Sequence, residues 1–217
     1  MKTWGAFKYE IARIINDPQA TKFPLDMLAC VNDALRLLAT SHTGVASVCT
    51  ITGDGATASF PVPSNAVSSA DIYRIRGIYD NTDLVWLLES DILPGYKMDE
   101  GYMIWPDGSL RINPVPAADV ELSMYYVAYY DEVVDDDSTL DLPGWAYEAV
   151  KLYTAGRVIQ TPTSQLTLLA NFRTKVDSGN PEHNPMLILS KYYIAQFWET
   201  LNANHAPQLD KLYVRRR

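Results

Sequence analysis

The spacing of apolar residues predicts helices at both ends of this 217-residue chain and strands between them. Apolar side chains recur every three or four positions in residues 3–16 and 23–39, which is the period of a helix with one buried face. Pro24 suits the first turn of the second helix, where its missing N–H is not needed. The same period returns in segments that start at Pro143, Ser164 and Pro185 and end near residues 160, 176 and 204.

The buried faces of these helices can be predicted from the same period. The first helix should bury Trp4, Phe7, Ile11, Ile14 and Ile15. The second should bury Leu25, Leu28, Val31, Leu35 and Leu38. The last should bury Leu187, Ile194, Trp198 and Leu201.

A period of two residues predicts strands in the middle of the chain. Residues 45–52 and 56–62 flank Gly53-Asp54-Gly55 and are expected to form a hairpin. Residues 102–105 and 110–112 are expected to form a second hairpin, and residues 120–130 form the strongest strand because of their β-branched and aromatic content. With weaker strands at 72–79 and 84–88, this region suggests a small antiparallel sandwich or barrel.

The predicted fold class is therefore α+β, with a helical bundle from both ends of the chain and an inserted antiparallel β-sandwich or barrel-like domain. Residues 1–42 and 143–204 are assigned to a discontinuous helical domain, and residues 43–142 to the β-rich insertion. Residues 205–217 contain Pro207 and no sustained period, so they are expected to be an extended C-terminal arm.

Charge is distributed unevenly along the chain. The overall net charge is −8, but the stretch from Asp80 to Asp141 contains fifteen acidic and two basic residues, a net −13. One interpretation is that the acids decorate solvated strand faces and turns; the other is a surface that repels nucleic acid. The candidates for such an acidic surface or channel lining are Asp131, Glu132, Asp135, Asp136 and Asp137. Residues 135–137 also resemble a cation site, but they lack the calcium-loop pattern, which favours a solvated turn.

Motifs for catalysis or cofactor binding are not found in the sequence. His42, His183 and His205 lie far apart, without metal-ligand spacing. Cys30 and Cys49 are expected to be small buried hydrophobes in a protein made in a reducing cytosol. No apolar run reaches the roughly 20 residues that a membrane-spanning helix needs. We therefore expect no catalytic residues, cofactor, metal or membrane insertion.

The 14 tyrosines allow two interpretations. Tyr125, Tyr126, Tyr129 and Tyr130 lie together on one predicted strand, where they could stack on sugars or bases. A strand places Tyr126 and Tyr130 on one face and Tyr125 and Tyr129 on the other. This division between two faces favours packing or an oligomer interface over a single open platform.

The end of the chain combines an apolar stretch with a basic tip: Leu212, Tyr213, Val214, Arg215, Arg216 and Arg217. Aromatic and arginine residues are common anchors of protein interfaces, so docking onto an acidic partner is one interpretation. A solvated terminus and direct contact with DNA phosphates are the alternatives.

Three stretches resemble the head-to-tail adaptor proteins of tailed bacteriophages, also called neck or head-completion connectors. They are residues 142–145 leading into 147–155, residues 50–63, and residues 110–116, and the resemblance in layout spans roughly residues 3–204. It implies a structural virion protein, made in the bacterial cytoplasm, that forms a ring of typically twelve copies below the portal. The implied partners are the portal protein, tail proteins of the nozzle, tube or fibre, further copies of the chain, and double-stranded DNA that passes through without specific binding.

The resemblance also gives the C-terminal segment a role, because in such adaptors it reaches up to the portal. Residues 212–217 would then be the portal-docking arm, and the acidic block would help DNA slide through the ring. A glycan-binding sandwich of a tail protein, which would use the tyrosines, is the main alternative. An enzyme would need a pocket with perturbed ionisable groups, which the sequence does not suggest.

Overall fold

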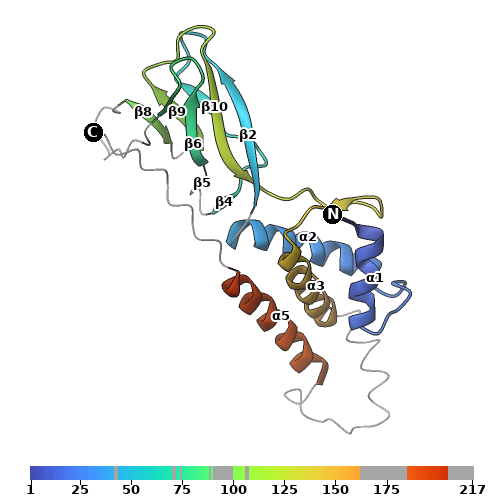
Figure 1. Cartoon of the computed structure of the whole chain (residues 1–217). Coiled ribbons are helices and arrows are strands. Elements are labelled where there is room, and N and C mark those ends of the chain that lie inside the picture. The colour runs from blue at the N-terminus through green and yellow to red at the C-terminus, as the bar shows by residue number, and fades with distance from the viewer. Residues whose placement is uncertain are drawn as a thin grey trace. The chain divides into compact units, whose positions relative to one another are not determined.

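A computed structural model describes residues 1–41, 44–69, 72–73, 75–87, 89, 100–105, 108–161 and 185–204. The chain divides into two compact units. Unit 1 consists of Met1–Leu38 and Tyr130–His205, and unit 2 of Ala39–Tyr129 and Ala206–Arg217. The α+β fold class is confirmed: helices come from both ends of the chain, and the stretch between them in the sequence forms antiparallel sheets (Figure 1). The assignment of three domains stays a prediction.

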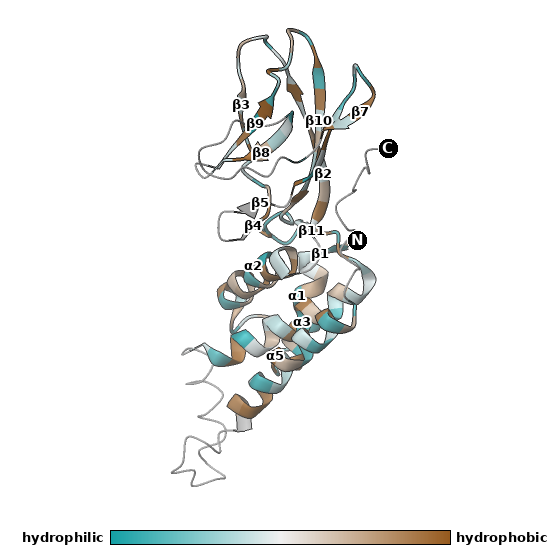
Figure 2. Ribbon diagram, turned by 90° about the vertical axis from the view of Figure 1, so that its left-hand side faces the viewer, coloured by the Kyte–Doolittle hydropathy of each residue, from teal (hydrophilic) through white to brown (hydrophobic). Residues whose placement is uncertain are grey.

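Unit 1 is built from α1 (Trp4–Ile14), α2 (Pro24–Ser41), α3 (Gly144–Gln160) and α5 (Pro185–Ala203). Their facing sides form one apolar core. In Figure 2 each of these helices carries both hydrophobic and hydrophilic residues, as helices with one buried face do. The largest fully buried side chains of this core are Phe7, Ile11, Ile15, Met27, Leu38, Ile159, Phe197 and Leu201.

Helices α3 and α5 approach each other closely because α3 has a glycine at the contact. A Cβ at Gly156 would lie 3.0 Å from Cγ1 of Ile194 and 3.1 Å from the carbonyl oxygen of Ser190. The buried Ser190 hydroxyl donates a 2.8 Å hydrogen bond to the Gly156 carbonyl. The rings of Tyr153 and Phe197 lie 4.8 Å apart, so the two helices are joined by polar and aromatic contacts together.

The predicted bounds of these four helices are confirmed to within two residues, but two buried faces were partly wrong. Leu25 of α2 is 79% exposed. The buried face of α2 contains Met27 and Ala34, which the prediction did not include, in place of Leu25. Trp198 is 40% exposed, while its neighbour Phe197 is fully buried. The helix predicted from Ser164 lies outside the described residues, as do all three histidines.

The described part of unit 2 contains two larger antiparallel sheets. The first has four strands, in the order β2 (Val45–Thr52), β10 (Glu121–Ala128), β6 (Ile75–Asp80), β7 (Val85–Leu87). The second has three, in the order β3 (Ser59–Pro61), β9 (Ser109–Asn113), β8 (Gly101–Ile104). Their inner faces share a core of Ile51, Ile78, Tyr102, Leu110, Ile112, Leu122 and Met124. Two sheets that share one core form a sandwich, which is one of the two architectures that the pattern predicted.

Two pairs of short strands form small separate sheets among the described residues: β4 (Ser68–Ser69) with β5 (Ile72–Tyr73) in unit 2, and β1 (Lys2–Thr3) with β11 (Thr139–Leu140) in unit 1.

One predicted hairpin is confirmed and the other is wrong. Strands β8 and β9 pair as expected. Residues 45–52 and 56–62 do not pair with each other, because β2 joins β10 and β3 joins β9 in the other sheet. The connection crosses between the sheets at Gly53, which exchanges backbone hydrogen bonds with Asp119 and Val120. A Cβ on Gly53 would lie 2.3 Å from the Ala117 carbonyl oxygen, so this close approach explains the glycine.

Candidate functional site

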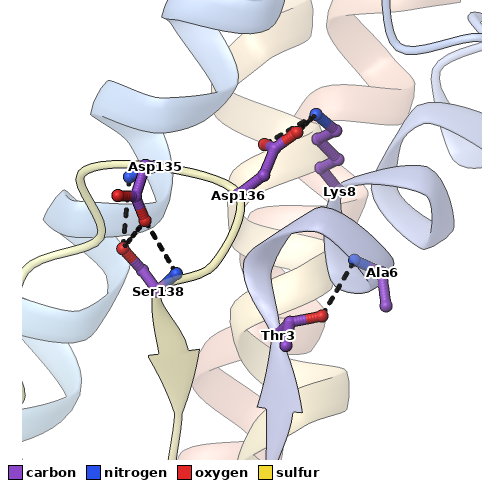
Figure 3. A network of polar contacts seen from close by, with 6 residues as sticks. All are labelled: Thr3, Ala6, Lys8, Asp135, Asp136 and Ser138. Carbon is purple, nitrogen blue, oxygen red and sulfur yellow. Dashed lines mark hydrogen bonds and ion pairs between the residues drawn. The ribbon is translucent and has the colours of Figure 1, made fainter.

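The acidic segment 131–138, here called the acidic turn, closes the N-terminal end of α1. The first amides of a helix have no partner within the helix. Here the Trp4 amide donates to the Ser138 carbonyl at 2.8 Å, and the Gly5 amide donates to the Asp136 carbonyl at 2.9 Å. The Thr3 hydroxyl accepts the Ala6 amide at 3.4 Å (Figure 3). The acidic turn therefore caps α1 with its own backbone, and its negative charge suits the positive end of the helix dipole.

The side chain of Asp135 holds the acidic turn in shape. Its Oδ1 accepts hydrogen bonds from the Ser138 amide and the Ser138 hydroxyl, both at 2.8 Å (Figure 3). The hydroxyl oxygen of Ser138 in turn accepts hydrogen bonds from the backbone amides of Val134 and Asp135. The hydrogen bonds from Ser138 lower the pKa of the Asp135 carboxyl below its usual value. Asp135 is thus part of the local fold of the turn.

Two other acids of the turn form ion pairs with unit 1 helices. The Lys8 amine lies 2.5 and 2.7 Å from the two carboxylate oxygens of Asp136 (Figure 3). Arg36 of α2 pairs with Glu132. Asp131 and Asp137 are exposed, and no described cation lies within ion-pairing distance of either. The five acids predicted as one surface therefore divide into three that hold the turn and two that face solvent freely.

An asparagine that sequence reasoning did not single out also anchors the turn. The side-chain amide of Asn32 donates to the Val133 carbonyl and accepts from the Val133 amide, both at 2.9 Å. Val133 itself is buried in the core of unit 1, as is Leu140, whose carbonyl accepts the Tyr147 hydroxyl. An isolated polar residue on a helix gives no sequence signal for such a pairing, because its partner lies about a hundred residues away.

A second candidate surface is the outer face of the four-stranded sheet. The Trp86 indole contacts Tyr79 and Tyr125, with ring centroids 5.2 and 5.4 Å apart. Its ring lies over Gly77, where a Cβ would be 3.1 Å away. Trp86 is 37% exposed, Tyr125 39%, and Val48, opposite Tyr125 on the neighbouring strand, 56%. These side chains form an apolar patch that the sequence did not single out.

The tyrosines of 125–130 are not one open platform. Tyr126 is buried, and its hydroxyl donates to Asn65 at 3.1 Å, while the Tyr129 hydroxyl donates to the Ser68 carbonyl. Tyr125 alone joins the exposed patch around Trp86. The two-faced arrangement predicted for a packing role is therefore present for Tyr125 and Tyr126.

Other candidate chemistry is sparse in the described part of the chain. No three His, Cys, Asp or Glu side chains among the described residues come together as a metal site requires, and no described helix is long and apolar enough to cross a bilayer. Both cysteines are free thiols. Burial raises the pKa of Cys30 to about 11, and burial also raises the pKa of the half-buried Cys49. The proposed docking residues Leu212–Arg217 lie outside the described residues.

Comparison with known proteins decides between the classes left open by the sequence. A sequence model of the SU10 adaptor protein family matches residues 2–182. The chain belongs to the SU10 adaptor family. This is a phage head-to-tail adaptor family, so the adaptor is a structural phage protein and its family is not a known enzyme family. No curated protein matches the chain.

Proposed function

We propose that this SU10 adaptor forms a ring, of twelve copies, that sits below the portal and links the capsid to the tail around the DNA channel. The observation that carries the proposal is the family match over residues 2–182, which covers helices α1, α2 and α3 of unit 1 and the strands of unit 2. A cyclic ring needs a contact between two different faces of neighbouring copies. Both units have exposed aromatic side chains, such as Tyr192 of α5 and Trp86 of β7. Such side chains are enriched in protein–protein interfaces and could be buried between neighbouring copies.

In this proposal the C-terminal segment docks onto the portal. Leu212, Tyr213 and Val214 supply apolar anchors, and the three final arginines supply charge for an acidic cleft. The segment follows α5, whose end at Ala203 leaves fourteen residues to reach a neighbouring protein.

Imaging of reconstituted complexes tests the ring and its arm. The purified adaptor is mixed with assembled portal, and the product is examined by electron microscopy and native mass spectrometry. We expect twelve adaptor copies per portal, and we expect deletion of residues 212–217 to abolish docking. A variant with Arg13→Ala, which removes an exposed arginine of α1 instead, is the control and should dock normally. Undiminished docking of the truncated chain would show that the arm assignment is wrong.

We further propose that Asp131 and Asp137, together with Glu132, Asp135 and Asp136, border the DNA channel. The support is that Asp131 and Asp137 are exposed and not neutralised by a described cation. Changing both to asparagine removes repulsion, so assembled rings should retain duplex DNA more tightly at low salt. Fluorescence anisotropy with a DNA duplex measures this. Equal DNA affinity of the double variant and the native ring would remove these residues from the channel.

A further inference from the structure

The two larger sheets of unit 2 have four outer edges, and three of them are poor places for another strand to join. Strand β7 is only three residues long. Strand β3 is equally short and ends in Pro61, which has no N–H to donate. The free side of β8 already carries a bridge between Tyr102 and Glu89. Short strands, proline and covered edges are the devices by which sheet proteins avoid joining other chains.

Within the described part of the chain, strand β2 has none of these devices. It runs for eight residues, Val45–Thr52, and its pairing with β10 is unbroken from Val45–Ala128 to Thr52–Glu121. It contains no charged residue and no proline. Among the described residues only β10 pairs with it, so its other side presents a row of backbone donors and acceptors. A long, uncharged and unprotected edge is a template for a further strand.

We propose that β2 pairs with β2 of a second copy, antiparallel about a two-fold axis. The identical strand matches the edge in length. It also brings no charge against an uncharged strand, because both partners have the same sequence. A two-fold axis perpendicular to the sheet makes the two strands antiparallel, which is the direction of every pair in this sheet. The product is one continuous eight-stranded sheet with the aromatic patches of both copies on the same side.

The alternation of side chains fixes where the axis passes. Ile51 points into the sandwich core and Cys49 packs against it, so Val48 belongs to the outer face. Residues that face each other across the two strands must lie on the same side of the sheet. This holds when one residue of β2 pairs with its own copy, so that the axis passes midway between the two copies of that residue. Val48 is the most exposed large apolar side chain of β2, at 56%. An axis at Val48 buries both copies of it against each other and extends the patch of Tyr125 and Trp86.

This contact belongs to the free protein and is independent of the proposed ring. A two-fold pair has no direction, whereas the copies of a ring between capsid and tail must all point the same way. The β2 pairing would hold the adaptor as a dimer in solution, and a polar ring would need other surfaces.

Sedimentation velocity of the full chain over a concentration series tests the pairing. We expect a dimer for the native protein. Val48→Lys places two ammonium groups opposite each other and removes the apolar contact, so self-association should weaken roughly tenfold or more. The matched control is Val134→Lys, the same change at a valine that is 70% exposed in the acidic turn, and it should leave the dimer intact. A native protein that stays monomeric, or a dimer that Val48→Lys does not weaken, overturns the proposal.

Crosslinking tests the register separately. In a Cys49→Ser background, Val48→Cys should give a disulfide-linked dimer on mild oxidation, because directly opposed Cβ atoms lie roughly 5 Å apart. Thr52→Cys in the same background is the control, since two copies of that position lie far from the axis on opposite sides; efficient linkage there instead would refute the Val48 register. Portal docking of Val48→Lys is measured in parallel. Loss of the dimer with normal docking supports both proposals, whereas an intact Val48-dependent dimer that never docks refutes the ring alone.

Discussion

The clearest test of how the acidic turn is held is the substitution Asn32→Ala. Asn32 makes two 2.9 Å hydrogen bonds to the backbone of Val133, a residue that is only 2% exposed. The substitution leaves one buried N–H and one buried C=O without their partner. Each such loss costs roughly 1 to 2 kcal/mol, so we expect unit 1 to lose about 3 kcal/mol of unfolding free energy.

The control for this experiment lies one turn further along the same helix. Arg36→Ala removes an exposed side chain together with its ion pair to Glu132, and such exposed pairs contribute about 0.5 kcal/mol or less. Denaturant unfolding followed by far-UV circular dichroism compares the two variants through the helices of unit 1. Hydrogen exchange at the Trp4 and Gly5 amides, which donate into the acidic turn, should accelerate in Asn32→Ala alone. If the two variants lose equal stability, the anchoring role of Asn32 is refuted.

Two further predictions concern other parts of unit 1. Gly156→Leu should destabilise the chain by about 2 kcal/mol or more, because the new side chain has no room against α5. Thermal unfolding should therefore show a lower midpoint. An unchanged midpoint would count against the close contact between α3 and α5. Because hydrogen bonds lower the pKa of Asp135 in the folded state, its contribution is complete above the unfolded pKa of about 4 and is lost as pH falls toward the lower folded value. The Ser138 amide resonance should therefore shift in this acidic window, and in Asp135→Asn it should not titrate there.

Local patterns predicted most elements of the fold. The helices α1, α2, α3 and α5, the β8–β9 hairpin and the long strand β10 all follow from residue spacing that neighbours in sequence can satisfy. The failed hairpin shows the limit of this reasoning. Gly53-Asp54-Gly55 has the composition of a tight turn, but the backbone of residues 117–120 approaches Gly53 and redirects the chain into the other sheet. That choice depends on a contact more than sixty residues away, which no local pattern contains.

The candidate surfaces were predicted less completely for the same reason. The sequence shows that residues 131–137 are acidic. It does not show that Lys8 and Arg36 pair with two of these acids, Asp136 and Glu132. Trp86 lies in a short apolar stretch of the sequence, residues 84–88. Nothing in that stretch predicts that its ring covers Gly77 and contacts Tyr125 across the sheet. Both arrangements require the register of paired segments, which the fold supplies and the sequence pattern does not.

The cap on α1 has a consequence for synthesis of the chain on the ribosome. The amides of Trp4 and Gly5 donate hydrogen bonds to the carbonyls of Ser138 and Asp136. The first helix to leave the ribosome therefore lacks this cap until more than half of the polypeptide has been translated. The strands of unit 2 all lie between those two points and can pair with one another in the meantime. The order of translation therefore favours a nascent chain whose central sandwich matures first, while the helix made at the outset stays unfinished until its distant cap arrives.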